Sequence, residues 1–192
     1  MEEALNLESL EQAIWEALTE SAQQNNGEFR YLHLASVNAA NEAESRAVVL
    51  RDVAQTKHLI YIHTDFRSDK VRQIQTNPIV SLSVYGAKSK IQLRLKGRGD
   101  ILHKNHQSAA ALEQLSLEAK KTYGLTLPDS GLGSKDMQLR GIYQAETVEE
   151  NFVLLRISVT ELKYLHLGAA YHTAAIFCYH EGKLVSKNWA MP

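Results

Sequence analysis

A short stretch from His63 to Ile74, with the sequence HTDFRSDKVRQI, carries the residue types that hold an anion. It follows the apolar run LIYI and changes at once to hydroxyls, basic residues and a helical pattern. We expect Ser68 to be the N-cap of this helix, where free backbone N–H groups and the helix dipole favour a phosphate. Lys70 in the first turn would then face that phosphate. The same pattern is also typical of an ordinary capped helix in which Asp69 pairs with Lys70, so both interpretations stay open.

Two further stretches are basic and strand-like. In SRAVVLR (45–51), Arg46 and Arg51 have opposite parity, so on a straight strand they face opposite sides. In KSKIQLRLKGR (88–98), one face is apolar and the other carries five cations interrupted by Gln92. The alternatives to a binding role are arginines at strand ends that reach water, and a basic edge that resists aggregation.

Other tempting residues are not expected to form a site. His103 and His106 have helical spacing but no cysteine or carboxylate cluster beside them, so no metal site is predicted. SGLGS at 130–134 lacks the GK[ST] ending and the preceding strand of a P-loop. No arrangement of Ser, His and Asp follows from spacing, and the catalytic residues remain unknown.

The composition restricts the partners and the compartment. The chain of 192 residues has 21 Lys or Arg and 22 Asp or Glu, so no global field would attract nucleic acid. No apolar stretch approaches the ~20 residues that span a bilayer, and the N-terminus MEEALNLESL is acidic, unlike a signal peptide. The single cysteine, Cys178, lies in the apolar run AAIFCY and is expected to be a buried, inert thiol. We expect a cytoplasmic protein that binds neither nucleic acid nor membrane.

The spacing of apolar residues predicts helices over 9–24, 68–76 and 105–123. Ser9 and Gln12 form a capping-box pair for the first helix, and Pro78 ends the second. Period-two alternation predicts the strands 29–37, 46–53, 57–63, 79–85, 90–102, 151–167 with a break near Thr160, 172–180 and 183–189.

These elements predict a mainly β (α+β) fold, a small antiparallel barrel with peripheral helices. No β-α-β-α alternation runs along the chain, which disfavours a doubly wound nucleotide-binding fold. Residues 124–150 show no clear period, and a connection of this length is usually functional or mobile. No linker divides the chain, so we expect residues 1–192 to form a single domain.

Three stretches in order resemble the pyridoxamine 5'-phosphate oxidase-like family of FMN-binding split barrels. The family pattern is R-x-V-x-L-[KR], a strand ending in [YH]-T, S-x-K at a helix start, N-P, and Q-[VL]-x-[VL]-x-G. This chain has RAVVLR at 46–51, IHTDFRSDKVRQIQTNP at 62–78 and IQLRLKG at 91–97, at matching separations. Each piece is weak alone, whereas the ordered series is specific. The resemblance is strong over 45–102, and both ends of the chain are more loosely similar to a branch other than the authentic oxidases.

The resemblance implies an antiparallel split β-barrel with FMN between the two subunits of a homodimer. It implies an FMN-dependent oxidoreductase in which a hydride passes through flavin N5, with Arg51 favouring the reduced flavin and the substrate unknown. The residues at the family's flavin-binding positions are Arg46, Val48, Val49, Leu50, Arg51, His63, Thr64, Ser68, Lys70 and Gln92. Of these, Arg46, Ser68 and Lys70 would hold the phosphate with Thr64 close by. The run 48–51 would lie beside the isoalloxazine ring, and Gln92 would meet the polar edge of the ring.

The sequence departs from the family's true oxidases at positions that bind substrate. Asp69 stands where the oxidases have an arginine, and AYHTAAIF at 170–177 keeps His172 but lacks the arginines of R-x-H-x-R. A tryptophan expected before this segment is Leu165 or His166. Oxidation of pyridoxamine phosphate itself is therefore not expected. The alternatives to an oxidoreductase are a non-catalytic carrier or sensor of flavin or another anion, and a dimeric scaffold that has lost the cofactor. The retained phosphate residues argue against the scaffold.

Overall fold

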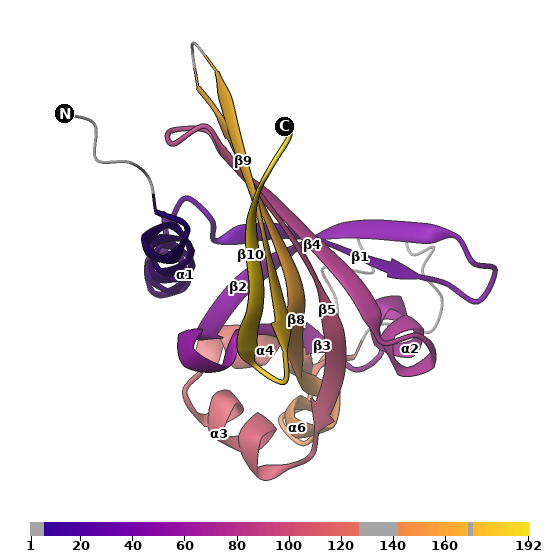
Figure 1. Cartoon of the computed structure of the whole chain (residues 1–192). Coiled ribbons are helices and arrows are strands. Elements are labelled where there is room, and N and C mark those ends of the chain that lie inside the picture. Colours follow the sequence, from indigo (N-terminus) through magenta and orange to yellow (C-terminus); the bar gives the residue numbers. More distant parts are fainter. Residues whose placement is uncertain (1–5, 127–141, 169–170) are drawn as a thin grey trace.

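The computed structural model describes residues 6–126, 142–168 and 171–192, and its main element is an antiparallel sheet of eight strands (Figure 1). These strands are β1 (Tyr31–Val37), β2 (Ala43–Ala54), β3 (Leu59–Asp65), β4 (Ile79–Gly86), β5 (Ile91–His103), β8 (Phe152–Leu167), β9 (His172–His180) and β10 (Lys183–Ala190). Their order is β10-β9-β8-β3-β2-β1-β4-β5, and β5 also pairs with β8. This second pairing closes six strands into a barrel, which confirms the predicted split-barrel fold.

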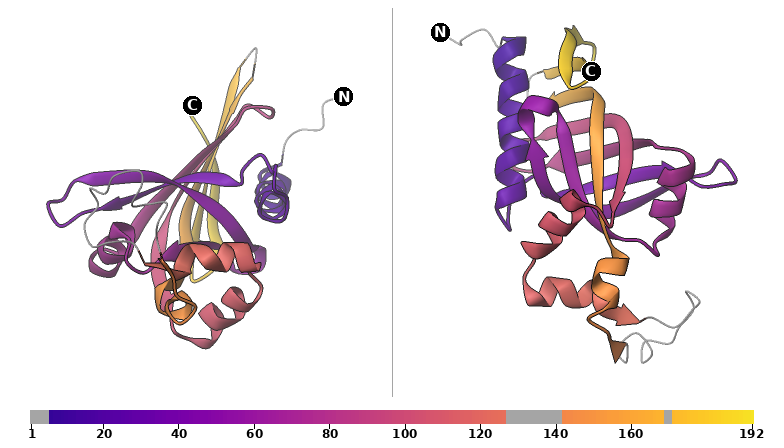
Figure 2. Two further views of the ribbon diagram at one scale, coloured as in Figure 1. Left: turned by 180° about the vertical axis from the view of Figure 1, so that it is seen from behind. Right: turned by 90° about the horizontal axis from the view of Figure 1, so that it is seen from below.

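Helices surround the barrel rather than alternating with its strands. They are α1 (Leu7–Gln23), α2 (Asp69–Thr76), α3 (His106–Glu113), α4 (Leu117–Gly124) and α6 (Thr147–Asn151), with the 3-10 turn η1 (Gln55–Lys57) and the short strands β6 (Leu125–Thr126) and β7 (Ile142–Tyr143). Helix α1 lies along the outside of the barrel beside β2, whereas α3, α4 and α6 gather at one end (Figures 1 and 2). The β4–β5 and β8–β9 hairpins extend together at the opposite end (Figure 1).

The barrel interior is filled by alternate residues of each strand. On β5, Leu93 and Leu95 are buried while Arg94 and Lys96 are exposed, as the sequence pattern predicts. The opposing strands contribute further branched and aliphatic side chains to the same core, which are Leu32, Leu34, Leu50, Ile60, Ile62, Leu82, Leu155 and Ile157. Burial of these apolar side chains is the main stabilising contribution to the barrel.

Strand β8 joins the barrel to the outer hairpin and changes partners along its length. It pairs with β3 up to Ser158 and with β9 from Glu161 onward. Its register against β5 shifts between Lys96 and Gly97, so Thr160 is an extra residue that bulges the strand. A Cβ on Gly97 would lie 2.5 Å from the Ser158 carbonyl oxygen, so only glycine permits this approach. The predicted break near Thr160 is therefore a bulge in a continuous strand.

Two predicted helix boundaries were wrong because other capping residues are used. Helix α1 begins after Asn6, whose side-chain oxygen accepts from the Glu8 amide at 3.0 Å, whereas Ser9 donates to the Asn6 carbonyl. The helix expected over 105–123 is two helices, because Ser116 caps α4 by accepting from the Ala119 amide at 3.3 Å.

Three further expectations have mixed outcomes. The connection 124–150 contains β7 and α6 and begins with the last residue of α4, while residues 127–141 lie outside the described ranges. Cys178 is half-buried rather than fully buried. Within the described parts of the chain, no helix is both long and apolar enough to cross a membrane.

Candidate functional site

The end of β3 and the start of α2 bring together polar groups that we call the anion cluster, made of Arg46, Thr64, Ser68 and Lys70. The Lys70 Nζ donates to Thr64 Oγ1 at 3.0 Å, and Thr64 Oγ1 lies 3.4 Å from Ser68 Oγ. Thr64 is buried at the rim of the barrel, while Lys70 and Ser68 are half-buried. The structure therefore places three of the predicted phosphate residues side by side.

Ser68 is the N-cap of α2, as predicted, but its hydroxyl does not cap the helix. Its Oγ donates to the Asp65 carbonyl at 2.6 Å, and no side chain of the described residues caps the α2 N-terminus. The Val71 amide donates to the Ser68 carbonyl, while the amides of Asp69 and Lys70 have no partner among the described residues and could donate to a ligand at the positive end of the dipole.

Lys70 has no carboxylate partner among the described residues, although two acids lie close in sequence. Asp65 pairs with Arg67 at 2.6 Å, and Asp69 pairs with Arg72 rather than with Lys70. Burial, together with repulsion from Arg46, lowers the pKa of Lys70 below its ordinary value. The expected Asp69–Lys70 pair is thus absent from the described contacts, and the cluster has an excess of positive charge.

Arg46 is held next to Lys70 by a buried hydrogen-bonded chain. Its Nη1 donates to Ser36 Oγ at 2.5 Å and its Nη2 to Gln73 Oε1 at 3.1 Å. Ser36 Oγ in turn donates to Gln73 Oε1 at 2.5 Å. Glu44 accepts from the outer side of the guanidinium at 3.3 Å. This chain links β1, β2 and α2, so it fixes the orientation of Arg46 before any ligand arrives.

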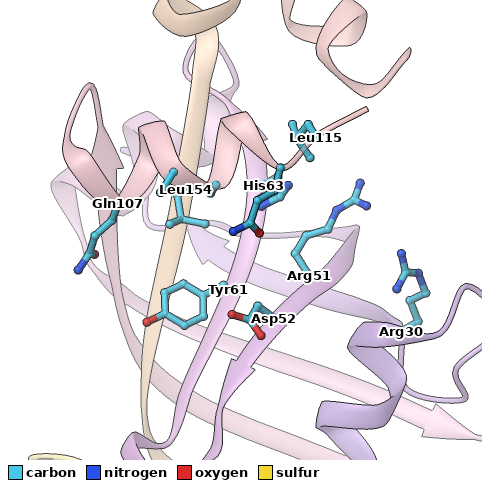
Figure 3. Close-up of a pocket in the computed structure, with 11 residues that line it drawn as sticks. Arg30, Arg51, Asp52, Tyr61, His63, Gln107, Leu115 and Leu154 are labelled. Carbon is cyan, nitrogen blue, oxygen red and sulfur yellow. The ribbon is translucent and has the colours of Figure 1, made fainter. Parts of the chain in front are cut away.

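A pocket of about 600 Å³ lies on the outer face of β2 and β3, beneath α3 (Figure 3). Figure 3 shows Gln107, Leu154 and Tyr61 on one side, Arg51 and Arg30 on the other, and His63 between them. We call it the α3 pocket, and the residues that line it are Arg30, Arg51, Asp52, Tyr61, His63, Gln107, Ala110, Ala111, Gln114, Leu115 and Leu154.

Strand β2 directs two consecutive side chains toward this pocket because it is bulged at Arg51. Leu50 pairs with Ile62 and Asp52 pairs with Tyr61, so Arg51 is the extra residue. The bulge places Arg51 and Asp52 at the same pocket, which strict alternation would not do. The predicted opposite orientation of Arg46 and Arg51 is confirmed, since Arg46 shares the core side with Val48 and Leu50 and Arg51 faces outward. Asp52 is the residue that departs from alternation.

His63 is neutral at neutral pH in this environment. Burial and, second, the nearby positive charge of Arg51 lower its pKa from 6.5 to about 4. Its Nδ1 is buried and has no hydrogen-bond partner in the described part of the chain, and its ring meets Phe152 edge to face with the ring centroids 5.1 Å apart. His63 therefore adds a neutral imidazole, not a cation, to the pocket.

The remaining predicted residues lie on two faces of the barrel wall. Val48 and Leu50 are buried in the core, so they could border a ligand only through their backbone. Val49 faces outward and pairs with Tyr31, while Gln92 pairs with Tyr85. Strands β1 and β4 lie between β2 and β5 in the sheet, so Val49 and Gln92 are separated by two strands.

The sequence did not identify most of the α3 pocket or the residues that hold Arg46. One helix face of the pocket could have been found from the sequence, because its residues follow the i, i+3, i+4, i+7 pattern. They are Gln107, Ala110, Ala111 and Gln114. Asp52 and Tyr61 give no such signal in the sequence, because their position at the pocket depends on the β2 bulge. Ser36 and Gln73 are distant in sequence and meet only in the folded chain.

Comparison with known proteins agrees with this geometry. The family model described as pyridoxamine 5'-phosphate oxidase, FMN-binding domain, matches residues 12–103. Pyridoxine/pyridoxamine 5'-phosphate oxidase 2 of Arabidopsis thaliana is 25% identical over 146 residues, which are 71% of this chain and 73% of that protein.

Solved structures share the fold over nearly the whole chain. A pyridoxamine 5'-phosphate oxidase-related, FMN binding protein from Nostoc punctiforme has a TM-score of 0.75 at 24% identity, covering 94% of this chain and 96% of that one. PhzG from Burkholderia lata, solved in complex with tetrahydrophenazine-1-carboxylic acid, has a TM-score of 0.70 at 14% identity, covering 94% and 90%. Residues 12–103 therefore match the FMN-binding domain of the pyridoxamine 5'-phosphate oxidase family, and the chain as a whole has the fold of the FMN-binding split barrels.

Proposed function

We propose that the protein binds FMN as a homodimer and is an FMN-dependent oxidoreductase. The observation that carries this proposal is the excess positive charge of the anion cluster. Lys70 and Arg46 repel each other at the uncapped start of α2, and the neighbouring aspartates are neutralised by other arginines. Arg46 is paired with Glu44, whereas Lys70 is a half-buried cation with no carboxylate partner among the described residues. Partial burial of an unpaired cation is costly, and a dianionic phosphate would reduce that cost.

The residues present fit the phosphate end of FMN. Lys70 and Arg46 would neutralise it, and Thr64 and the free amides of α2 would donate hydrogen bonds to it. Bound FMN would supply a hydride acceptor, whereas the chain itself would bind, orient and exclude water. Val49, on the outward side of β2, would support the ring. The α3 pocket lies next to this run of β2 and would hold the substrate.

The outer face of the sheet supports the proposed dimer. Tyr31 is 61% exposed and pairs with Val49, and Tyr85 is 51% exposed and pairs with Gln92. Large exposed aromatic side chains on a flat sheet face are typical of a surface that a partner covers. A second copy would also seal a flavin that lies on this face.

A variant with both Tyr31→Arg and Tyr85→Arg tests the dimer. We expect the mass measured by light scattering to fall from twice 21.5 kDa to a single chain, with loss of FMN. Leu117→Arg is the matched control, because Leu117 is 78% exposed on α4, away from this face. A wild-type protein that is already monomeric when loaded with FMN would contradict the proposal.

The proposed activity is tested in two steps on the purified protein. FMN at a hundred times its dissociation constant should add about 2.7 kcal/mol to the free energy of unfolding, and riboflavin at the same concentration should add less. Anaerobic mixing with a series of amines and reduced nicotinamides should then bleach the visible absorption of the flavin for at least one donor.

A second candidate function is a non-catalytic flavin carrier. It is favoured by one observation, that residues 171–177 contain no arginine to bind an anionic substrate. Bound FMN that no donor in the series reduces would support the carrier. Absence of any FMN binding would instead refute both functions.

A further inference from the structure

The α3 pocket, like the anion cluster, has one free cation within the described part of the structure, but here that cation is an exposed arginine. Arg51 is exposed and has no ion pair or side-chain hydrogen bond among the described residues. Arg30 is buried, and its Nη1 donates to the Ala22 carbonyl at 2.6 Å, so its guanidinium is already bonded to the C-terminal end of α1. Asp52 adds one negative charge to the same pocket. The net charge of the lining is therefore a single positive charge, and Arg51 is the group free to meet an anion.

The other polar groups of the pocket are neutral. His63 carries no charge at neutral pH and exposes an imidazole beside Arg51. Gln107 and Gln114 come from one face of α3, two turns apart, and their amides have no partner among the described side chains. Amides of this kind donate and accept hydrogen bonds but add nothing to the neutralisation of a dianion.

The remaining wall leaves room for an apolar body. Ala110 and Ala111 lie between the two glutamines on the helix, and Leu115, Leu154 and Tyr61 complete the lining. A volume of about 600 Å³ is in the range of pockets that hold one small organic ligand. The small alanines keep the space between helix and sheet open.

We infer that the α3 pocket takes a carboxylated substrate, a ring or short apolar chain with one carboxylate held by Arg51, and not a phosphate ester. That this ligand is a substrate rests on the proposed oxidoreductase function, whereas the preference of the pocket for a carboxylate can be measured whether or not the protein is an enzyme. Arg51 would hold the carboxylate in a charge-assisted, forked pair, and Gln107 and Gln114 would bind the other polar groups of the ligand.

Three probes that share a phenyl ring test the preference. Benzoate carries one negative charge, phenyl phosphate carries close to two at pH 8, and benzyl alcohol carries none. Binding is measured by saturation-transfer NMR and calorimetry on protein with and without added FMN. We expect benzoate to bind at least tenfold more tightly than benzyl alcohol, since a charge-assisted hydrogen bond contributes a factor of about ten to a hundred. Benzoate should also bind more tightly than phenyl phosphate, because the second negative charge of the phosphate would lie near Asp52, and no further cation of the described lining is free to neutralise it.

Variants locate the binding. Arg51→Gln should weaken benzoate about ten- to a hundredfold, whereas Lys57→Gln, which removes an exposed cation elsewhere, should leave it unchanged. Ala111→Phe should block benzoate by filling the pocket while FMN still binds. Phenyl phosphate as the preferred probe, benzoate binding insensitive to Arg51→Gln, or loss of FMN binding in Ala111→Phe would each overturn the inference. Failure of the proposed function appears separately, as wild-type protein that does not take up FMN.

Discussion

The anion cluster and the α3 pocket begin on adjacent residues of one strand, yet they suit different ligands. Thr64 points to the barrel rim, where it meets the unpaired Lys70 next to Arg46, whose outer side is paired with Glu44. His63 points to the outer face, where its neutral ring lies beside Arg51. Because successive residues of a strand face opposite sides, one short segment contributes to both sites. The difference shows how a barrel wall can separate the binding of a cofactor phosphate from the binding of a substrate.

The two sites also differ in how firmly their cations are held. Arg46 is fixed by Ser36 and Gln73, and Lys70 by Thr64, so the anion cluster is organised before a ligand binds. Arg51 has no such partner among the described residues. A preorganised site loses less entropy on binding, which suits a cofactor that stays bound, whereas a free side chain suits a ligand that exchanges.

The largest expected effect comes from removing both cations of the anion cluster. Arg46→Ala with Lys70→Ala should weaken FMN by about 2–5 kcal/mol, because a bound phosphate would be left buried without its charge partners. Riboflavin, which lacks the phosphate, should lose little affinity, and benzoate at the α3 pocket should be unaffected. Fluorescence titration of the flavins measures the first two values.

The control for this variant is Lys57→Ala, which removes an exposed cation of η1, at the opposite end of β3 from α2. It should leave FMN affinity within a factor of about two. An equal loss of riboflavin and FMN in the double variant would mean that the cluster supports the fold and not a phosphate.

The sequence predicted the anion cluster better than the α3 pocket for a physical reason. Thr64, Ser68 and Lys70 lie within seven residues, and their positions follow from one strand end and one helix start. The alternation of apolar residues likewise predicted every strand of the barrel, since the core face of a strand is a local property. Gln92 was predicted on a basic face, and its distance from Val49 could be known only from the order of the strands.

The α3 pocket could not be predicted because it depends on contacts between distant segments. The bulge at Arg51 arises from the pairing of β2 with β3, and nothing in the local sequence requires it. The break between α3 and α4 depends on the N-cap at Ser116, whereas the apolar pattern of the sequence continues through this position and predicts one helix. Both features determine which side chains line the pocket, so an error in either hides the site.

The second prediction uses the neutral state of His63, which distinguishes the α3 pocket from the anion cluster. In the unfolded chain His63 binds a proton below its ordinary pKa of 6.5, while in the folded protein it stays neutral down to about 4. The unfolded state therefore binds more protons between these values, and the free energy of unfolding falls as the pH is lowered through that window. The His63 contribution is at most about 3 kcal/mol.

Denaturant unfolding at several pH values, with wild type compared with His63→Gln, measures this contribution. The variant should show a flatter dependence between pH 6.5 and 4, because glutamine does not titrate. Parallel curves for the two proteins would mean that folding does not lower the pKa of His63. The ring would then take up a proton below pH 6.5, and the α3 pocket would gain a second cation in that range.

The smallest effect is expected at Gln73, which tests whether the anion cluster is held in place before the ligand binds. Gln73 is buried, and its Oε1 accepts from both Ser36 and Arg46. Gln73→Leu keeps the approximate size but leaves a buried hydroxyl and one guanidinium nitrogen with fewer partners, which should lower the free energy of unfolding by about 1–2 kcal/mol. FMN affinity should fall about threefold, since Arg46 would lose part of its fixed orientation. Gln75→Leu on the exposed face of α2 should change both quantities little. If Gln73→Leu lowers stability but leaves FMN affinity at the wild-type value, Arg46 does not need its buried chain to meet the phosphate, and preorganisation would no longer separate the two sites.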